Sequence, residues 1–171
     1  GWVSVGITHD TAEFAVNTIV TWWQNMRCKA YPRTKELLIT ADGGGSNGWR
    51  VRLWKVELQK LANRLNKTIH VCHFPPGTSK WNKIEHRMFC HITENWRARP
   101  LESRAVVVNC IANTTTKKGL KIGSALALDK YSVCQGLDEN EYETGLKITD
   151  EEMNKIAIEG CQFHGEWNYK I

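Results

Sequence analysis

Short apolar runs alternate along the chain with longer segments in which apolar residues recur every three or four positions. Three runs have the length of strands, at 2–7, 36–41 and 69–74. Four longer segments carry an apolar stripe at helical spacing, at 10–26, 49–65, 79–96 and 103–113. The resulting order is strand, helix, strand, helix, strand, helix, helix. This order predicts an α/β domain with helices packed on a sheet.

The strand at 36–41 contains a continuous Leu37-Leu38-Ile39 run. A run without alternation is typical of a strand buried on both faces, in a parallel or mixed sheet. The pattern weakens beyond Thr114, so we interpret 1–115 as a core and 116–171 as a C-terminal extension of the same domain. The extension repeats Gly-Leu-Lys-Ile at 119–122 and 145–148, which suggests two similar strands in a hairpin, and a further helix is expected to begin near Thr149.

Charge and composition narrow the function only slightly. The net charge of +5 permits a polyanionic partner without requiring one. Lys117, Lys118 and Lys121 either contact phosphates or form a solvated face. Stretches of about 18 apolar residues, as a membrane span requires, do not occur.

Six cysteines are scattered along the chain without a CxxC pair. We therefore expect reduced, mostly buried thiols rather than a disulfide framework. Cys72-His73 and Cys90-His91 resemble a zinc pattern only weakly, because both pairs fall inside predicted regular elements.

Asp42 is the first candidate for chemistry. It follows a predicted strand and precedes the glycine-rich segment 43–48. Ligands of α/β proteins gather at the carboxyl ends of strands, where a carboxylate can hold a metal ion. An aspartate that bonds its own turn is the alternative.

Glu85 is the second candidate. On a regular helix it falls among Trp81, Met88 and Phe89, on the apolar side. A carboxylate there requires a metal ion or an ion-pair partner. If Asp42 and Glu85 reach one edge of the sheet, they could share divalent cations, since Mg²⁺ prefers hard oxygen ligands.

Four segments together resemble one known family, the Rhodopirellula-type DDE transposases. They are GITHDTAEFA at 6–15, LLITADGGGSNG at 37–48, HFPPGTSKWNKIEHR at 73–87 and FHGEWNY at 163–169. The resemblance runs nearly from end to end. It implies a ribonuclease H-like mixed sheet flanked by helices, and a metal-binding triad of two aspartates and a glutamate.

Transferred residue by residue, the resemblance makes Asp42 the second acid and Glu85 the third, with 42 residues between them. They would hold two Mg²⁺ or Mn²⁺ ions. The family's first aspartate lies on the first strand of the sheet, and this chain resembles the family only from the third strand onward. We therefore expect an N-terminally truncated fold, with the first strands missing and the first aspartate upstream of Gly1.

Other polar residues are expected near this site. Asp10 can cap the helix at 10–26 with Glu13 as its partner in a capping box, or either carboxylate can approach the metals. Lys80, Asn82, His86 and Arg87 flank Glu85 and either support the site and contact DNA or form an exposed helix face.

The resemblance implies a DNA transposase of a bacterial insertion sequence, which cuts and joins DNA strands with metal ions. This chain alone would be incomplete as an enzyme. The alternatives are a hydrolytic nuclease of ribonuclease H-like fold and an inactive, truncated remnant. The expected partners are the element ends and target DNA and, in addition, a homo-oligomer. The expected location is the cytoplasm, at the nucleoid when DNA is bound.

Overall fold

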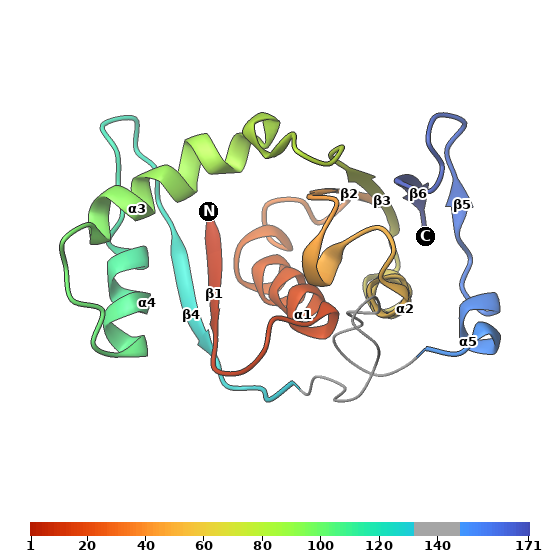
Figure 1. The fold of residues 1–171 in the computed structure, drawn as a ribbon, viewed down its shortest axis with the longest axis horizontal. Coiled ribbons are helices and arrows are strands. Elements are labelled where there is room, and N and C mark those ends of the chain that lie inside the picture. The colour runs from red at the N-terminus through yellow and green to blue at the C-terminus, as the bar shows by residue number, and fades with distance from the viewer. Residues whose placement is uncertain (132–147) are drawn as a thin grey trace. The chain divides into compact units, whose positions relative to one another are not determined.

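The computed structural model describes residues 1–131 and 148–171 (Figure 1). Short 3-10 and π-helical turns, labelled η, accompany the regular elements. In chain order the elements are β1 (Trp2–Gly6), α1 (Ala12–Trp22), η1 (Trp23–Arg27), β2 (Glu36–Ala41), η2 (Gly45–Asn47), α2 (Arg52–Leu65), β3 (Thr68–His73), η3 (Ser79–Trp81), η4 (Glu85–Phe89), α3 (Cys90–Trp96), α4 (Arg104–Ala112), β4 (Gly123–Ala127), α5 (Asp150–Asn154), β5 (Glu159–Gly160) and β6 (Asn168–Lys170). The predicted mixed α/β class is confirmed.

The described chain forms two compact units, and each is assembled from segments distant in sequence. One unit, here called the β1 unit, contains Gly1–Thr8 and Thr78–Lys130. The other, the β2 unit, contains His9–Gly77 and the described part of Tyr131–Ile171.

The β2 unit holds a mixed four-stranded sheet in the order β2-β3-β6-β5. β2 and β3 are parallel and in register from Glu36 opposite Thr68 to Ala41 opposite His73. β6 is antiparallel to both β3 and β5. The carboxyl ends of β2 and β3 therefore lie at one edge of the sheet, as parallel pairing requires.

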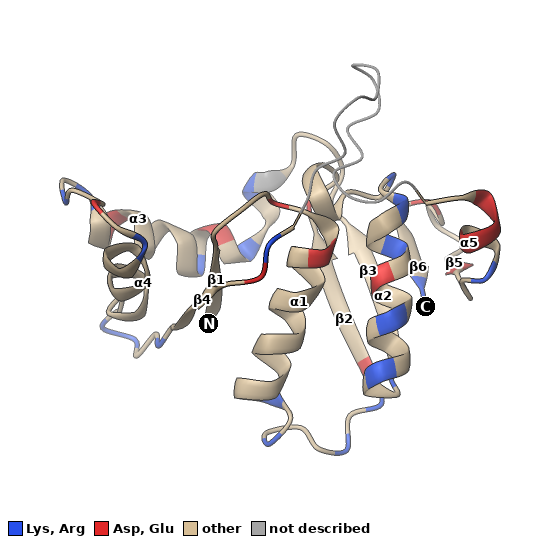
Figure 2. Cartoon of the chain, turned by 90° about the horizontal axis from the view of Figure 1, so that it is seen from below, with Lys and Arg blue, Asp and Glu red and all other residues tan. Residues whose placement is uncertain are grey.

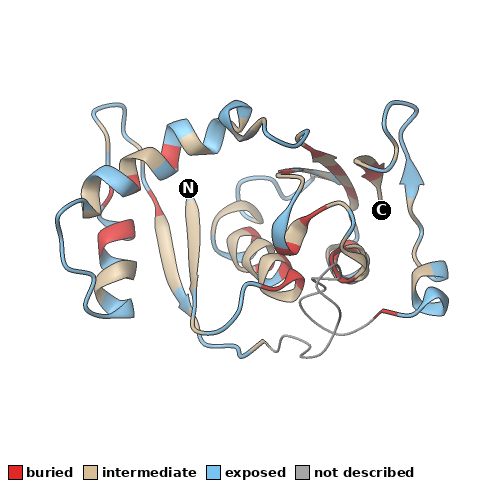
Figure 3. Ribbon diagram, viewed as in Figure 1, coloured by how far each residue is buried: buried red, intermediate tan, exposed pale blue. Residues whose placement is uncertain are grey.

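Helices α1 and α2 pack side by side against this sheet (Figure 2). Between them lies the main core of the β2 unit, which Figure 3 shows as buried segments. Trp54, Leu58 and Leu61 project into it from α2, and Ile69 and Val71 project from β3. Figure 2 marks several lysine and arginine positions along α2, which are Arg52, Lys55, Lys60 and Arg64.

The β1 unit has a smaller sheet, in which β1 and β4 run parallel. Its separate core contains Met88, Ile92, Ile111 and Ile122. The Ser103 hydroxyl caps α4 by accepting a hydrogen bond from the Val106 N–H, at 3.3 Å. The helix predicted at 103–113 is thus confirmed, as is the helix expected near Thr149, where α5 begins with a Thr149–Glu152 capping box.

Three expectations about regular structure are wrong. The segment 79–96 is not one continuous helix but passes through η3, η4 and α3. β2 is not buried on both faces, because it is an edge strand of the described sheet and Leu38 is 63% exposed. The Gly-Leu-Lys-Ile segment at 119–122 precedes β4 instead of forming a hairpin strand, and most of its second copy lies outside the described residues.

The capping box expected at Asp10 and Glu13 is also wrong. The N-cap of α1 is Thr11, whose hydroxyl accepts from the Phe14 N–H at 3.3 Å. Asp10 instead accepts a hydrogen bond from the Ser46 hydroxyl, at 3.0 Å. Aspartate and threonine are both good N-cap residues, so the sequence did not distinguish two adjacent candidates.

The cysteines are less buried than expected. Five of the six fall within the described residues, all with free thiols, and of these five only Cys110 is buried. Burial raises the pKa of the Cys72 thiol, with a smaller contribution from Cys161. Among the described residues, moreover, none forms a helix long and apolar enough to cross a membrane.

Candidate active site

Asp42 lies where the sequence placed it, immediately after β2. The preceding residue, Ala41, is buried and pairs with His73 of β3. The Ala41 carbonyl also accepts a hydrogen bond from the Phe74 N–H, at 2.8 Å, which extends the pairing past the end of β3. Asp42 itself is half-buried. Its carboxylate is therefore carried on a fixed sheet edge and retains contact with solvent.

A tight glycine loop follows Asp42 and forms the 3-10 turn η2. Gly45 has φ +74°, a value that favours glycine. At Gly48 an added Cβ would lie 3.1 Å from the Gly45 carbonyl oxygen, so a side chain would displace the turn. The buried Ser46 donates to Asp10, which ties this loop to the start of α1. The loop therefore holds Asp10 nearby, although not as the predicted cap.

His73 also lies at this edge, and no role was predicted for it from the sequence. It is buried at the end of β3, and its Nδ1 lies 3.0 Å from the Trp167 carbonyl oxygen. Its Nε2 lies 2.9 Å from the Asn47 carbonyl oxygen. His73 thus connects the glycine loop to the C-terminal segment. The alternation of β3 could have indicated the burial of His73, since Ile69, Val71 and His73 share its buried face.

Glu85 begins the π-helical segment η4 in the β1 unit and is half-buried. The apolar surroundings predicted for it are only partly present: Met88 is buried, whereas Trp81 is 59% exposed and Phe89 is 37% exposed. A regular 100° rotation per residue misplaces these side chains, because neither a 3-10 nor a π turn follows it. π-helical turns are frequent at functional sites, which keeps Glu85 a candidate.

The residues around Glu85 form local hydrogen bonds. His86 Nε2 lies 2.8 Å from the Lys80 carbonyl oxygen. The Asn82 side chain accepts from the Ile84 N–H at 3.4 Å, and the Asn82 carbonyl oxygen accepts from the Glu85 N–H at 3.2 Å. Lys80, His86 and Arg87 are exposed. The segment therefore presents two cations and an imidazole to solvent beside the Glu85 carboxylate.

Asp42, Asp10 and Glu13 belong to the β2 unit, and Glu85 belongs to the β1 unit. Within the described residues, no three histidine, cysteine, aspartate or glutamate side chains lie close enough together to hold a metal ion. In the described part of the chain, none of the candidate acids therefore belongs to a ready-made group of three metal-binding side chains.

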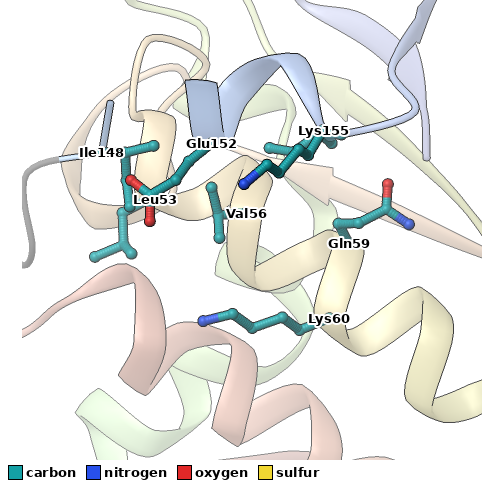
Figure 4. A pocket seen from close by; sticks show the side chains of 8 residues that line it. Leu53, Val56, Gln59, Lys60, Ile148, Glu152 and Lys155 are labelled. Atoms are coloured by element: carbon teal, nitrogen blue, oxygen red, sulfur yellow. The ribbon is translucent and has the colours of Figure 1, made fainter. Parts of the chain in front are cut away.

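A pocket of about 490 Å³ lies elsewhere in the β2 unit, between α2 and α5 (Figure 4). Leu53 and Val56 give it an apolar floor, and Lys60, Glu152 and Lys155 surround it. None of the acids predicted for the site lines it. With a single carboxylate among its lining residues, this surface depression between helices does not resemble a metal centre.

The chain matches the family described as Rhodopirellula transposase DDE domain over residues 1–171. Because the match covers the whole chain, the protein belongs to this family, as the four segments predicted. Neither a curated protein nor a solved structure matches the chain significantly. Transposition, with DNA as the partner, is what the family indicates.

Proposed function

We propose that this chain is the catalytic region of a bacterial insertion-sequence transposase. It would cleave phosphodiester bonds at the element ends and join the freed 3′ hydroxyl to target DNA. The observation that carries this proposal is the family match over residues 1–171. The half-buried Asp42 at the carboxyl edge of β2 supports it, because it occupies the place of a metal-binding acid in an α/β sheet.

Asp42 and Glu85 are the proposed metal ligands, within a ribonuclease H-like fold. Both are hard oxygen donors, as Mg²⁺ and Mn²⁺ prefer. Two bound ions would supply activation of the attacking oxygen and charge stabilisation at the leaving oxygen. A DDE triad needs a third carboxylate in addition to Asp42 and Glu85. Asp10 lies on the loop side of Asp42, and it and Glu13 remain candidates near the metals.

The side chains beside Glu85 would act on DNA rather than on metal. Lys80 and Arg87 are exposed cations, suited to contacts with phosphate oxygens. Asn82 and His86 are proposed to hold the Glu85 turn through their bonds to Ile84 and Lys80. Cleavage without strand joining would indicate a hydrolytic nuclease of the same fold, and an intact protein without either activity would indicate a remnant.

The test replaces each proposed ligand in the whole transposase by its isosteric amide, as Asp42→Asn and Glu85→Gln. Each change removes a charge that binds metal, so cleavage of DNA carrying the element ends should fall by about 100-fold or more. Matched controls are Asp150→Asn in the β2 unit and Glu94→Gln in the β1 unit, whose carboxylates pair with Arg52 and His91. These controls should cleave normally.

Cleavage is measured on labelled DNA in Mg²⁺, and strand joining is measured separately with pre-cut ends. Circular dichroism checks that each variant is folded. Normal cleavage by either Asp42→Asn or Glu85→Gln would remove that residue from the metal site.

A further inference from the structure

An aromatic array lies on the β2 unit and plays no part in the proposed metal chemistry. It comprises Phe163, His164, Trp167 and Trp49. The His164 and Trp167 rings are stacked with centroids 5.1 Å apart, and Phe163 meets His164 edge-on at 4.4 Å. Trp49 lies 6.2 Å from Trp167, and the Arg50 guanidinium lies 4.6 Å from the centre of the Trp49 ring.

The outer end of this array faces solvent. Phe163 is 74% exposed, the highest exposure of the large apolar residues described. The His164 side chain is 49% exposed. Aromatic rings that pack in a hydrophobic core are buried. Phe163 is mostly exposed, and His164 is about half exposed. A single exposed apolar side chain would need no explanation, whereas adjoining exposed rings form a patch of the kind that marks interaction sites.

The turn that carries the array is held by backbone contacts. The Cys161 N–H donates to the Asn168 carbonyl at 2.8 Å, and the Trp167 N–H donates to the His164 carbonyl at 2.9 Å. A Cβ added to Gly165 would meet the Cys161 carbonyl oxygen at 2.8 Å, so the close packing of this turn depends on glycine. The rings are therefore presented on a fixed support, which lowers the entropy cost of binding.

The array also lies beside the candidate metal ligand of its own unit. The Trp167 carbonyl accepts from the His73 N–H at 3.1 Å, at the end of β3. A Cβ added to Gly43, the residue after Asp42, would lie 3.9 Å from Trp49 Cδ1. Trp167 and Trp49, at the inner end of the array, are thus anchored at the sheet edge that carries Asp42.

We propose that the aromatic array stacks unpaired bases of the DNA strand that is bound at Asp42. This inference rests on the proposed function. Exposed aromatic rings bind nucleobases through their faces, and only unpaired bases offer a free face. Arg50 would contact the phosphates of the same strand. Glu166 Oε1 lies 3.3 Å from His164 Nδ1, where it orients the imidazole.

The experiment measures DNA binding by the whole transposase in EDTA, so that no cleavage occurs. The probe is a duplex with a single-stranded extension of about four nucleotides, near the smallest site seen for single-strand binding. A blunt duplex of the same sequence is the reference. A 2-aminopurine in the extension reports stacking directly, because its fluorescence is quenched when it stacks on a ring.

The wild-type protein should bind the extended duplex more tightly than the blunt one and quench the 2-aminopurine. Phe163→Leu keeps an apolar side chain without a ring. It should weaken binding of the extension by about 5-fold or more and relieve the quenching. Phe163→Trp should retain both properties. The matched control is Leu38→Ala, which removes a comparably exposed apolar side chain, 63% against 74%, from β2.

Two outcomes would overturn the inference. One is unchanged binding and quenching in Phe163→Leu. The other is an equal loss on extended and blunt DNA, which would assign the array to duplex or protein contact. Because EDTA removes divalent ions, the binding measurement does not depend on the proposed metal ligands. A failed cleavage prediction therefore affects the metal site, whereas a failed quenching prediction affects the array alone.

Discussion

Tyr169 shows how a single buried residue near the site affects stability. It is 1% exposed, and neither its hydroxyl nor the Trp54 indole N–H has a partner with full hydrogen-bond geometry among the described residues. Burial raises the pKa of Tyr169, and the adjacent Trp54 offsets this only in part. The hydroxyl still interacts with the Trp54 indole, and removing one member of a buried polar pair leaves the other unsatisfied.

Tyr169→Phe is therefore expected to destabilise the protein by about 1 kcal/mol at neutral pH, because the buried Trp54 N–H loses the hydroxyl. Because the pKa of Tyr169 is raised in the folded state, the tyrosine of the unfolded chain loses its proton at a lower pH than in the folded protein, at about pH 10. Wild-type stability should therefore fall as the pH rises above that value, and Tyr169→Phe should fall less. Urea unfolding at neutral and alkaline pH measures both effects. Tyr31→Phe, at an exposed tyrosine, is the control and should change neither.

At the same scale, the sequence indicated single residues better than their contacts. The apolar run before Asp42 and the glycines after it correctly predicted that Asp42 directly follows a strand. The role of His73 was missed because the alternation of β3 predicts a buried side chain but not the groups that it contacts. Its two carbonyl partners come from residues 26 and 94 positions away, and no local pattern encodes such distances.

Among the elements, α1, α4 and α5 begin at side-chain caps, which the sequence located to within one residue. Thr11 is fully buried and caps α1, whereas Asp10 is bonded to the glycine loop. Helix propensity cannot separate these roles, because both side chains suit an N-cap. The hydrogen bond to Ser46, formed only in the folded chain, decides between them.

Thr11→Ala is expected to destabilise the β2 unit by about 1 kcal/mol, the usual cost of losing an N-cap. Thr11→Ser keeps the hydroxyl and should recover most of the loss. Asp10→Ala leaves the cap intact and should cost less than Thr11→Ala. Chemical denaturation of the three variants gives the order. A larger effect at Asp10 than at Thr11 would mean that the Ser46 bond, rather than the cap, fixes the start of α1.

The segment 79–96 illustrates the limit of periodicity at this scale. Its apolar spacing fits a regular helix, but the chain forms 3-10, π and α turns in succession. Each change of turn type rotates the following side chains relative to a 100° pattern. Glu85 therefore does not lie within the apolar cluster that regular helical spacing predicted. Composition carries no information on such turns, so this part of the site could not be predicted from the sequence.

For the whole molecule, the sequence predicted the α/β class but not the division into units. Short-range patterns describe β1, α1, β2, α2 and β3 one by one. They do not reveal that β1 pairs with β4, which begins more than a hundred residues later, rather than with β2. That pairing assigns the first eight residues to a different unit from the helix that follows them.

The two cores share no residue within the described part of the chain, so a cavity in one should act mainly on its own unit. Leu58 is fully buried in the β2 unit and Ile111 is 3% exposed in the β1 unit. Leu58→Ala and Ile111→Ala should each cost about 2–5 kcal/mol, through lost transfer energy and an unfilled cavity.

Native-state hydrogen exchange locates the effect. Leu58→Ala should speed exchange in α2 and β3, and Ile111→Ala should speed it in α4, β1 and β4. Equal acceleration throughout the chain in either variant would show that the units open together. In that case, mutations far from Asp42 would reach its sheet edge through global unfolding rather than through the local packing of the β2 unit.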